Sequence, residues 1–226
     1  MTQQEVLKRL HSLAHPASIE GKKRWNITAK NQLGITMPQL RSLAKTVGRN
    51  HDLALALWKT GIHEARILAS MIDDPALVTE QQMDSWTADF DSWDVCDQTC
   101  GNLFDKTKYA YKKIAQYSAD DREFVRRTAF TLIATLAVHD KEQCDARFIS
   151  LLPLIKKYAT DDRNFVKKAV NWALRQIGKR NATLNPIAIA TARQLLKLDS
   201  SSARWIARDA LRELESEAVK KRVMKG

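Results

Sequence analysis

The chain has 226 residues, 44% of them hydrophobic and 28% charged, which are the proportions of a folded protein with a sizeable core. Its 37 lysines and arginines outnumber its 26 aspartates and glutamates, and the formal net charge of +11 makes nucleic acid the first partner to consider. No apolar run approaches the ~18 to 20 residues of a membrane span, the N-terminus lacks the order of a signal peptide and the cysteines form no CxxC pair, which argues against a membrane protein, a disulfide framework and a zinc ribbon.

Residues that favour turns are scarce, with seven glycines and five prolines, and the sequence therefore predicts an almost entirely helical protein. Helical periodicity, N-capping residues and prolines suited to a first turn place the expected helices at 3–14, 17–31, 37–48, 51–58, 62–71, 79–90, 92–105, 108–117, 121–137, 144–158, 162–178, 185–197 and 201–220. No linker or low-complexity tract divides them, so we expect a single domain over residues 1–226. Its expected parts are N-terminal helices at 1–60, a repeat core at 61–214 and a basic tail at 215–226, of which residues 220–225 are expected to fray.

An internal repeat with a period of ~40 residues indicates how these helices are arranged. Residues 120–127 reappear with small changes as residues 161–168, and a weaker third copy places Trp205 where the second copy has Phe165. This period, with a helix-forming composition, indicates stacked helix pairs of the HEAT or armadillo type. We therefore expect an all-α, right-handed α-solenoid with a concave basic groove. The equivalent cations of the three copies are expected to form a row, which consists of Arg127, Lys168 and Arg208.

Helical spacing separates an apolar stripe from a second, mixed face in the later helices. In the expected helix 162–178 the inward stripe consists of Phe165, Val166, Ala169, Val170, Ala173 and Ile177. The second face carries Lys168, Trp172 and Arg175 at i, i+4 and i+7, and a tryptophan between two cations is out of place on a solvated face. The alternative for any single tryptophan is packing between repeats.

Two further helices carry side chains that would face the same way. In the expected helix 92–105, Trp93 and Asp97 share a face at i, i+4, while Cys96 and Cys100 point toward the core as small hydrophobic residues. In the expected helix 121–137, apolar side chains pack inward and Arg127 is expected to stay out of the core. If these faces align, a carboxylate sits inside an otherwise cationic and aromatic groove.

These motifs resemble one known family. The stretches Ser92-Trp93-Asp94-Val95-Cys96-Asp97, Arg127-Thr128-Ala129 and 165–175 are similar to those of the DNA alkylation repair family, the HEAT-repeat alkylpurine DNA glycosylases. The resemblance is strong over residues 62–178 and looser over 33–45, while Arg24-Trp25-Asn26 departs from the family's groove-lining aromatic. It implies an active-site quartet, which consists of Trp93, Asp97, Arg127 and Trp172.

The resemblance implies hydrolysis of the N-glycosidic bond of cationic alkylated purines, of the 3-methyladenine and 7-methylguanine type, in duplex DNA. Asp97 would stabilise the oxocarbenium-like transition state and position the attacking water. Trp93 and Trp172 would contact the cationic nucleotide through their ring faces, and Arg127 would hold a phosphate beside the lesion. No lysine belongs to the quartet, so water rather than an amine is the expected nucleophile and the enzyme is expected to be monofunctional.

Seven cations are candidates for contacts with DNA phosphates: Arg66, Lys167, Lys168, Arg175, Lys179, Arg208 and Arg212. The alternative for each of them is a solvated surface residue. We expect no metal, because His11 and His15 lack a third ligand, and no cofactor, because neither GxGxxG nor GxxxxGK occurs. The expected protein is a cytoplasmic monomer that associates with the nucleoid when bound to DNA. Two other functions stay open, a non-catalytic HEAT-repeat protein that binds distorted or branched DNA and a HEAT-type protein-binding scaffold.

Overall fold

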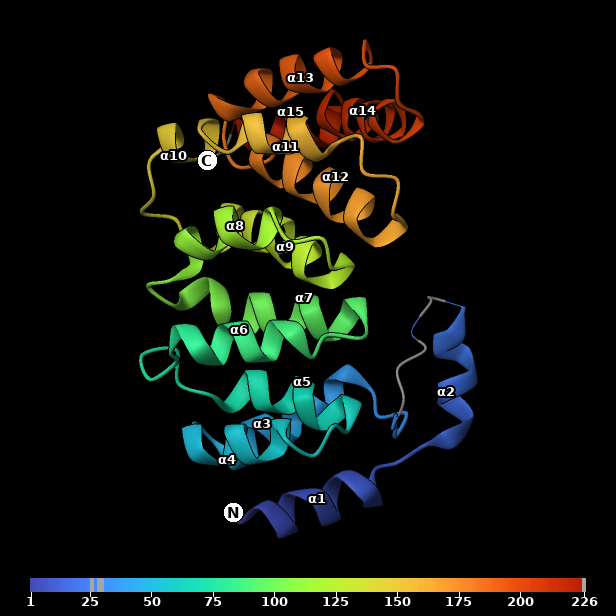
Figure 1. The fold of residues 1–226 in the computed structure, drawn as a ribbon, viewed down its shortest axis with the longest axis vertical. Helices are drawn as coiled ribbons and strands as arrows, with labels where there is room; N and C mark the ends of the chain where they lie inside the picture. Colours follow the sequence, from blue (N-terminus) through green and yellow to red (C-terminus); the bar gives the residue numbers. More distant parts are fainter. Residues whose placement is uncertain (25–26, 28–30, 225–226) are drawn as a thin grey trace. The chain divides into compact units, whose positions relative to one another are not determined.

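The computed structural model describes residues 1–24, 27 and 31–224, and no β-strand occurs among them. Contacts divide the chain into two compact units, an N-terminal unit, Met1–Tyr109, and a C-terminal unit, Ala110–Gly226. The boundary between the units falls within the repeat core expected at 61–214. The predicted all-helical fold is confirmed (Figure 1), and Trp25 lies outside the described residues.

The helices of the N-terminal unit begin at capping residues that the sequence supplies. Its elements are α1 (Gln3–Ser12), α2 (Pro16–Lys23), α3 (Met37–Val47), α4 (His51–Trp58), α5 (His63–Ile72), α6 (Glu80–Ala88), α7 (Trp93–Asn102) and the 3-10 turn η1 (Phe104–Lys106). Thr2 and Glu5 form a capping box at α1, and the Asn50 side chain accepts a hydrogen bond from the backbone N–H of Leu53 at the start of α4. Helix α5 packs against α3, α4 and α7 and is the central helix of the unit.

Aromatic rings join α4 to α6 in this unit. The rings of Trp58 and Trp86 stack with their centroids 3.9 Å apart and an interplanar angle of 6°. Phe90 and Phe104 extend the cluster, with centroids 6.0 Å from Trp58 and 6.3 Å from Trp86 respectively. All four side chains are buried, so these two tryptophans belong to the core.

A buried carboxylate ties the segment before α3 to α5. Glu64 is fully buried, and its two carboxylate oxygens accept hydrogen bonds from the backbone N–H groups of Leu33, at 2.8 Å, and Gly34, at 2.9 Å. Gly34 has φ 77°, and a Cβ there would lie 2.2 Å from the carbonyl oxygen of His15. The close approach of the two backbone segments therefore requires glycine.

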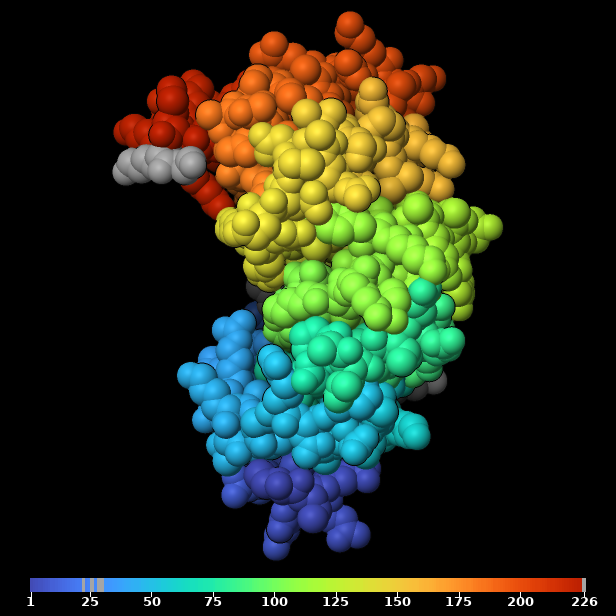
Figure 2. All heavy atoms as spheres, turned by 90° about the vertical axis from the view of Figure 1, so that its left-hand side faces the viewer, coloured from blue at the N-terminus to red at the C-terminus, as the bar shows by residue number. Residues whose placement is uncertain are grey.

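The C-terminal unit consists of paired helices that pack in two rows. Its elements are α8 (Ala110–Ser118), α9 (Glu123–His139), α10 (Asp145–Ile149), α11 (Leu152–Tyr158), α12 (Asn164–Gly178), α13 (Leu184–Leu195), α14 (Ser201–Leu214) and α15 (Glu217–Val223). Three long helices, α9, α12 and α14, pack side by side and form what we call the long-helix row. Helices α8, α11 and α13 each pack against a member of this row, and α13 also contacts α10 and α11. In the space-filling view of Figure 2, the yellow atoms of α10 and α11 lie against the orange atoms of later residues of this unit.

The repeat predicted from the sequence is visible at the starts of α9 and α12. Asp120 accepts hydrogen bonds from the backbone N–H and the Nε of Arg122, at 2.9 and 3.0 Å. Asp161 accepts the same two bonds from Arg163, at 3.1 and 2.9 Å. The two copies therefore fold into the same Asp-X-Arg turn before a long helix.

Arg126 joins the two copies. Its guanidinium donates to Asp161 of the second copy at 2.8 Å, to Asp121 of its own copy at 2.9 Å and to the carbonyl oxygen of Ser118 at 3.0 Å. Farther along the row, a Cβ on Gly178 would lie 2.7 Å from Leu214 and 2.9 Å from Ala188, so this glycine permits the close packing of α12 with α13 and α14.

Two expected helices are each divided in the structure. The expected helix 144–158 ends as α10 at Ile149 and resumes as α11, whose first turn contains Pro153. The expected helix 201–220 is interrupted near Ser216, whose hydroxyl accepts a hydrogen bond from the N–H of Val219 and starts α15.

The first residues of the tail segment that is expected to fray, 220–223, are helical in the structure. Helix α15 continues to Val223, and Val219 and Val223 are buried, because they occupy one face of α15 at i, i+4. No described helix has the length and apolar character that a membrane crossing requires.

Candidate functional site

Helix α7 of the N-terminal unit carries Trp93 and Asp97 one turn apart, and both residues are half-buried. Cys96 and Cys100 of the same helix are completely buried, which confirms the orientation predicted from the spacing. Helix α7 therefore packs its sulfur-bearing face into the core, and its adjacent face carries an indole and a carboxylate that are partly accessible.

The start of α7 is fixed by a buried histidine of α5. Asp94, the second residue of α7, accepts a hydrogen bond from the Ser92 hydroxyl and one from the N–H of Val95 at 3.0 Å. Its other carboxylate oxygen lies 2.9 Å from Nε2 of His63, which is 2% exposed. The turn that carries Trp93 is thereby held to the central helix of the unit.

The electrostatic environment of α7 affects its thiols. Burial raises the pKa of Cys100 well above its usual range, with further contributions from the hydrogen bond to Cys96 and from the charges of Cys96, Asp97 and Asp105. The thiol of Cys100 is therefore neutral at physiological pH.

Arg127 is not where the sequence placed it. It is 5% exposed, and its Nη1 donates to the carbonyl oxygen of Phe165 at 2.7 Å. Phe165 lies in the first turn of α12, so this hydrogen bond crosses the contact between α9 and α12. Arg127 is buried because its side chain lies in that contact. Two corrections follow: Arg127 does not stay out of the core, and it does not share an exposed cationic row with Lys168 and Arg208.

Helix α12 of the C-terminal unit has the two faces that its sequence predicts. Five of the six expected inward residues are completely buried and Phe165 is half-buried, whereas Trp172 is half-buried and Lys168 is exposed on the second face. Trp172 is therefore partly accessible, as Trp93 is in the other unit.

Three cations of the C-terminal parts of α12 and α14, one of them the residue that caps α12, pair with two carboxylates of α14. Glu213 accepts hydrogen bonds from Arg175 and Lys179, and Asp209 pairs with Arg212 and lies 3.6 Å from Arg175. The pKa of Glu213 is lowered: burial alone would raise it, but Lys179 and Arg175 outweigh that effect. These three cations, all candidates for DNA binding, therefore face an opposite charge within the protein.

The other candidate cations on these two helices have different surroundings. Lys168 and Arg208 are exposed and have no carboxylate partner within the described part of the chain. The Nζ of Lys167 lies 5.2 Å from the ring centroid of Trp205. Of the candidates for DNA binding in this unit, Lys167, Lys168 and Arg208 are thus the ones that no carboxylate of the described residues pairs with.

Arg66, the remaining candidate for DNA binding, belongs to the N-terminal unit. Its side chain is 16% exposed, lies 5.3 Å from the ring centroid of Trp58 and donates to the carbonyl oxygen of Asp89 at 3.0 Å. These contacts indicate a structural role in the α4–α6 region.

The sequence interpretation missed three acidic or histidine side chains: His63, Asp209 and Glu213. The last two are spaced at i, i+4 on α14, and each bonds a residue 38 positions earlier, Asn171 and Arg175 respectively. This separation of 38 residues is close to the repeat period, so the repeat could have indicated that Asp209 and Glu213 lie opposite Asn171 and Arg175. Among the described residues, no group of three His, Cys, Asp or Glu side chains is placed to hold a metal ion.

Stacked helix pairs with equivalent loops and a row of long helices define a HEAT-like repeat protein. The fold agrees with a solved structure described as that of a new family of proteins related to the HEAT-like repeat DNA glycosylases with affinity for branched DNA structures. The TM-score is 0.81 at 19% sequence identity, and the match covers 99% of this chain and 96% of the other.

The sequence itself identifies the family. Residues 6–214 match the family described as DNA alkylation repair enzyme, and the chain belongs to this family. A comparison with curated protein sequences finds no match.

Proposed function

We propose that this protein is a monofunctional DNA glycosylase that removes cationic alkylated purines, of the 3-methyladenine and 7-methylguanine type, from duplex DNA. The observation that carries the proposal is Asp97, a half-buried carboxylate one helical turn from the half-buried Trp93. In a protein with a formal net charge of +11, such a carboxylate opposes the binding of a polyanion, so its presence favours a role in the chemical step.

The chemistry requires a negative charge near the sugar. Alkylation at N3 or N7 makes a purine cationic and weakens its glycosidic bond, and bond cleavage moves positive charge onto the sugar. Asp97 would stabilise this oxocarbenium-like state and orient a water toward the anomeric carbon. A preorganised group of this kind contributes about 3 to 4 kcal/mol to transition-state stabilisation.

The aromatic and cationic residues support binding of the damaged strand. Trp93, half-buried beside Asp97, would contact the cationic nucleotide and contribute ~0.5 to 2 kcal/mol. In the C-terminal unit, Trp172 is also half-buried and would contact DNA through its ring face. Lys168 and Arg208, both exposed, would contact phosphates. Arg127, which is 5% exposed, would act mainly by holding the first turn of α12 in place.

The test is to incubate the protein with methylated DNA and to measure the release of free 3-methyladenine and 7-methylguanine. In single-turnover assays Asp97→Asn is expected to slow excision by roughly a hundredfold, about 2.7 kcal/mol, because it removes the charge while keeping size and hydrogen bonding. The affinity for the same duplex is expected to stay equal or to rise. Asp91→Asn, an exposed carboxylate in the loop before α7, is the matched control and should change neither quantity. Excision by Asp97→Asn at the wild-type rate would remove Asp97 from the mechanism.

A second candidate function is non-catalytic binding of distorted or branched DNA. It is favoured by the structural agreement with a protein whose family is described as having affinity for branched DNA structures. If wild-type protein releases no alkylated purine but binds a four-way junction more tightly than a linear duplex, this second function replaces the first.

A further inference from the structure

One aromatic side chain of the C-terminal unit is exposed although its repeat equivalents are not. Trp205, in the second turn of α14, is 40% exposed. The corresponding positions of the first two copies hold Phe124 and Phe165, which are half-buried and contact each other with ring centroids 5.3 Å apart. The third copy therefore carries a larger ring where less of the protein covers it.

The cation beside this ring also differs from its repeat equivalent. Arg126, in the first copy, is bonded to Asp121 and Asp161. Lys167, in the second copy, has no carboxylate partner among the described residues, because the third copy has Ser201 and Ser202 where the second has Asp161 and Asp162. Its ammonium group instead lies 5.2 Å from the ring centroid of Trp205.

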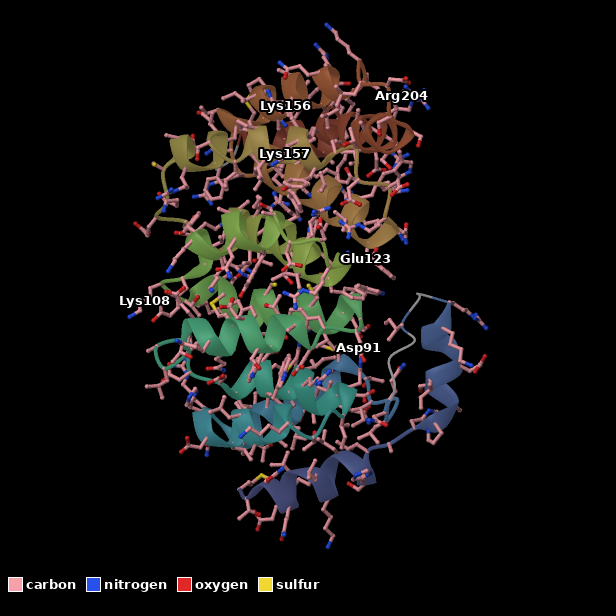
Figure 3. The ribbon with its side chains drawn as sticks, viewed as in Figure 1. Asp91, Lys108, Glu123, Lys156, Lys157 and Arg204 are labelled. Carbon is pink, nitrogen blue, oxygen red and sulfur yellow. The ribbon has the colours of Figure 1, made fainter. Side chains whose placement is uncertain are left out.

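The same two helices carry two further exposed cations. Lys168 is adjacent to Lys167 in sequence, and Arg208 follows Trp205 by one turn of α14; both are exposed. In Figure 3, Glu123 and Arg204, near the starts of α9 and α14, lie at the right-hand edge of this unit, whereas Lys156 and Lys157 of α11 lie away from that edge. An accessible indole with an ammonium group 5.2 Å from its ring centroid, and with two further exposed cations on the same helices, fits a ligand that combines a flat ring with phosphate charge.

We propose that Trp205 and Lys167 bind one unpaired nucleotide of single-stranded DNA next to a duplex, with the base on the indole ring and a phosphate on the Lys167 ammonium group. A base inside a duplex is stacked on both sides and offers no free face, so the site selects an overhang, a gap or the arm of a branch. Stacking on an aromatic ring tolerates any base sequence. The inference rests on the DNA-binding part of the proposed function and is independent of base excision.

The experiment compares two labelled DNAs, a blunt duplex and the same duplex with a short single-stranded thymidine overhang. Wild-type protein is expected to bind the overhang DNA more tightly. Trp205→Ala should lower the affinity for the overhang DNA by roughly fivefold to a hundredfold, the range for the loss of one base–aromatic stack, and should leave the blunt duplex nearly unaffected. Trp205→Phe should retain most of the preference, because a ring is still present.

One further variant tests the charge of the site, and two control variants lie outside it. Lys167→Ala should reduce the slope of log K against log salt by about 0.7 to 0.9, the value for a single phosphate neutralised by one cation. Lys157→Ala removes a cation that lies 5.0 Å from the ring of Tyr158 on α11 and should leave the preference for the overhang unchanged. Leu196→Ala, which trims a side chain that is 36% exposed, should do the same.

A second measurement does not depend on the alanine variant folding. The overhang should quench tryptophan fluorescence in wild-type protein, and the quenching should be smaller in Trp205→Phe. Equal quenching in the two proteins, or an overhang preference that survives Trp205→Ala, would overturn the inference. If wild-type protein binds neither DNA, the DNA-binding part of the proposed function fails; if it binds both equally, only the present inference fails.

Discussion

The repeat supplies a matched pair of substitutions that isolates the bond between its two copies. Asp120 and Asp161 occupy equivalent Asp-X-Arg turns, and only Asp161 also accepts a hydrogen bond from Arg126 of the preceding copy. Asp161→Asn therefore perturbs the turn and the junction, whereas Asp120→Asn perturbs the turn alone. We expect Asp161→Asn to lower the free energy of unfolding by about 2 kcal/mol and Asp120→Asn by about 0.5 kcal/mol.

These magnitudes follow from pKa and exposure together. Burial raises the pKa of Asp161, but hydrogen bonds from Arg163 and Arg126 outweigh it and lower the pKa from 3.8 to about 2. That drop corresponds to ~2.4 kcal/mol, and the Asp161 side chain is only 6% exposed. The hydrogen bond from Arg122 lowers the pKa of Asp120 to about 2 as well. The Arg122 side chain, however, is 62% exposed, so solvent screening reduces the energy of that pair to the range of a surface salt bridge.

The assay is urea unfolding of the wild type and both variants between pH 7 and pH 2. A carboxyl group whose pKa is lowered by folding stabilises the protein above its unfolded-state pKa, and this contribution is lost as the pH falls through the folded-state value. The difference between wild type and Asp161→Asn should therefore be largest near pH 7 and should shrink from about pH 4 to about pH 2. Equal destabilisation by the two substitutions at pH 7 would refute the reasoning, because the junction would then contribute nothing beyond the turn.

Two further predictions concern the C-terminal unit. Trp172→Ala, at a half-buried position, should cost well under the ~3 to 5 kcal/mol of a buried tryptophan while it slows excision; a large loss of melting temperature with excision per folded molecule preserved would assign Trp172 to the core. Replacing Lys168 and Arg208 together by alanine should flatten the dependence of log K on log salt by up to ~0.9 for each phosphate that is no longer neutralised, as measured by DNA titration. For each cation removed, Arg175→Ala should change that slope less, because Glu213 already pairs with Arg175. An equal change per cation would show that this ion pair opens when DNA binds.

The sequence was sufficient for the helices and for the spacing of the principal side chains. The expected helix 51–58 is α4, His51–Trp58, because Asn50 is a strong N-cap and an apolar run follows it. Trp93 and Asp97 share a face of α7 as predicted, because i, i+4 spacing needs no knowledge of the partner helix. The sequence prediction missed the breaks between α10 and α11 and before α15. Pro153 and Ser216 each lie at the start of a new helix there, and the sequence prediction places both residues inside longer helices.

Contacts between helices were beyond the reach of a single sequence. Repeat equivalence gave the register of Arg127 with Lys168, but it did not show that the guanidinium bonds the backbone of Phe165 on the next helix. It likewise did not show that Glu213 neutralises Arg175. The hydrogen bond and the ion pair each depend on which residue of the neighbouring helix lies opposite the arginine. Copies of a repeat differ at such single positions, so the repeat pattern does not predict these partners.

The positions of the three cysteines determine which part of the protein an alkylating agent can modify. Agents that alkylate purines also attack thiols, and the reactive form of a thiol is its thiolate. Cys96 and Cys100 flank Asp97 on α7, yet both are inaccessible, and the raised pKa of Cys100 keeps it protonated. Cys144, the exposed cysteine, precedes α10 in the C-terminal unit. An electrophile would therefore be captured at Cys144, and the helix that bears Asp97 would keep its packing during the exposure that creates alkylated bases.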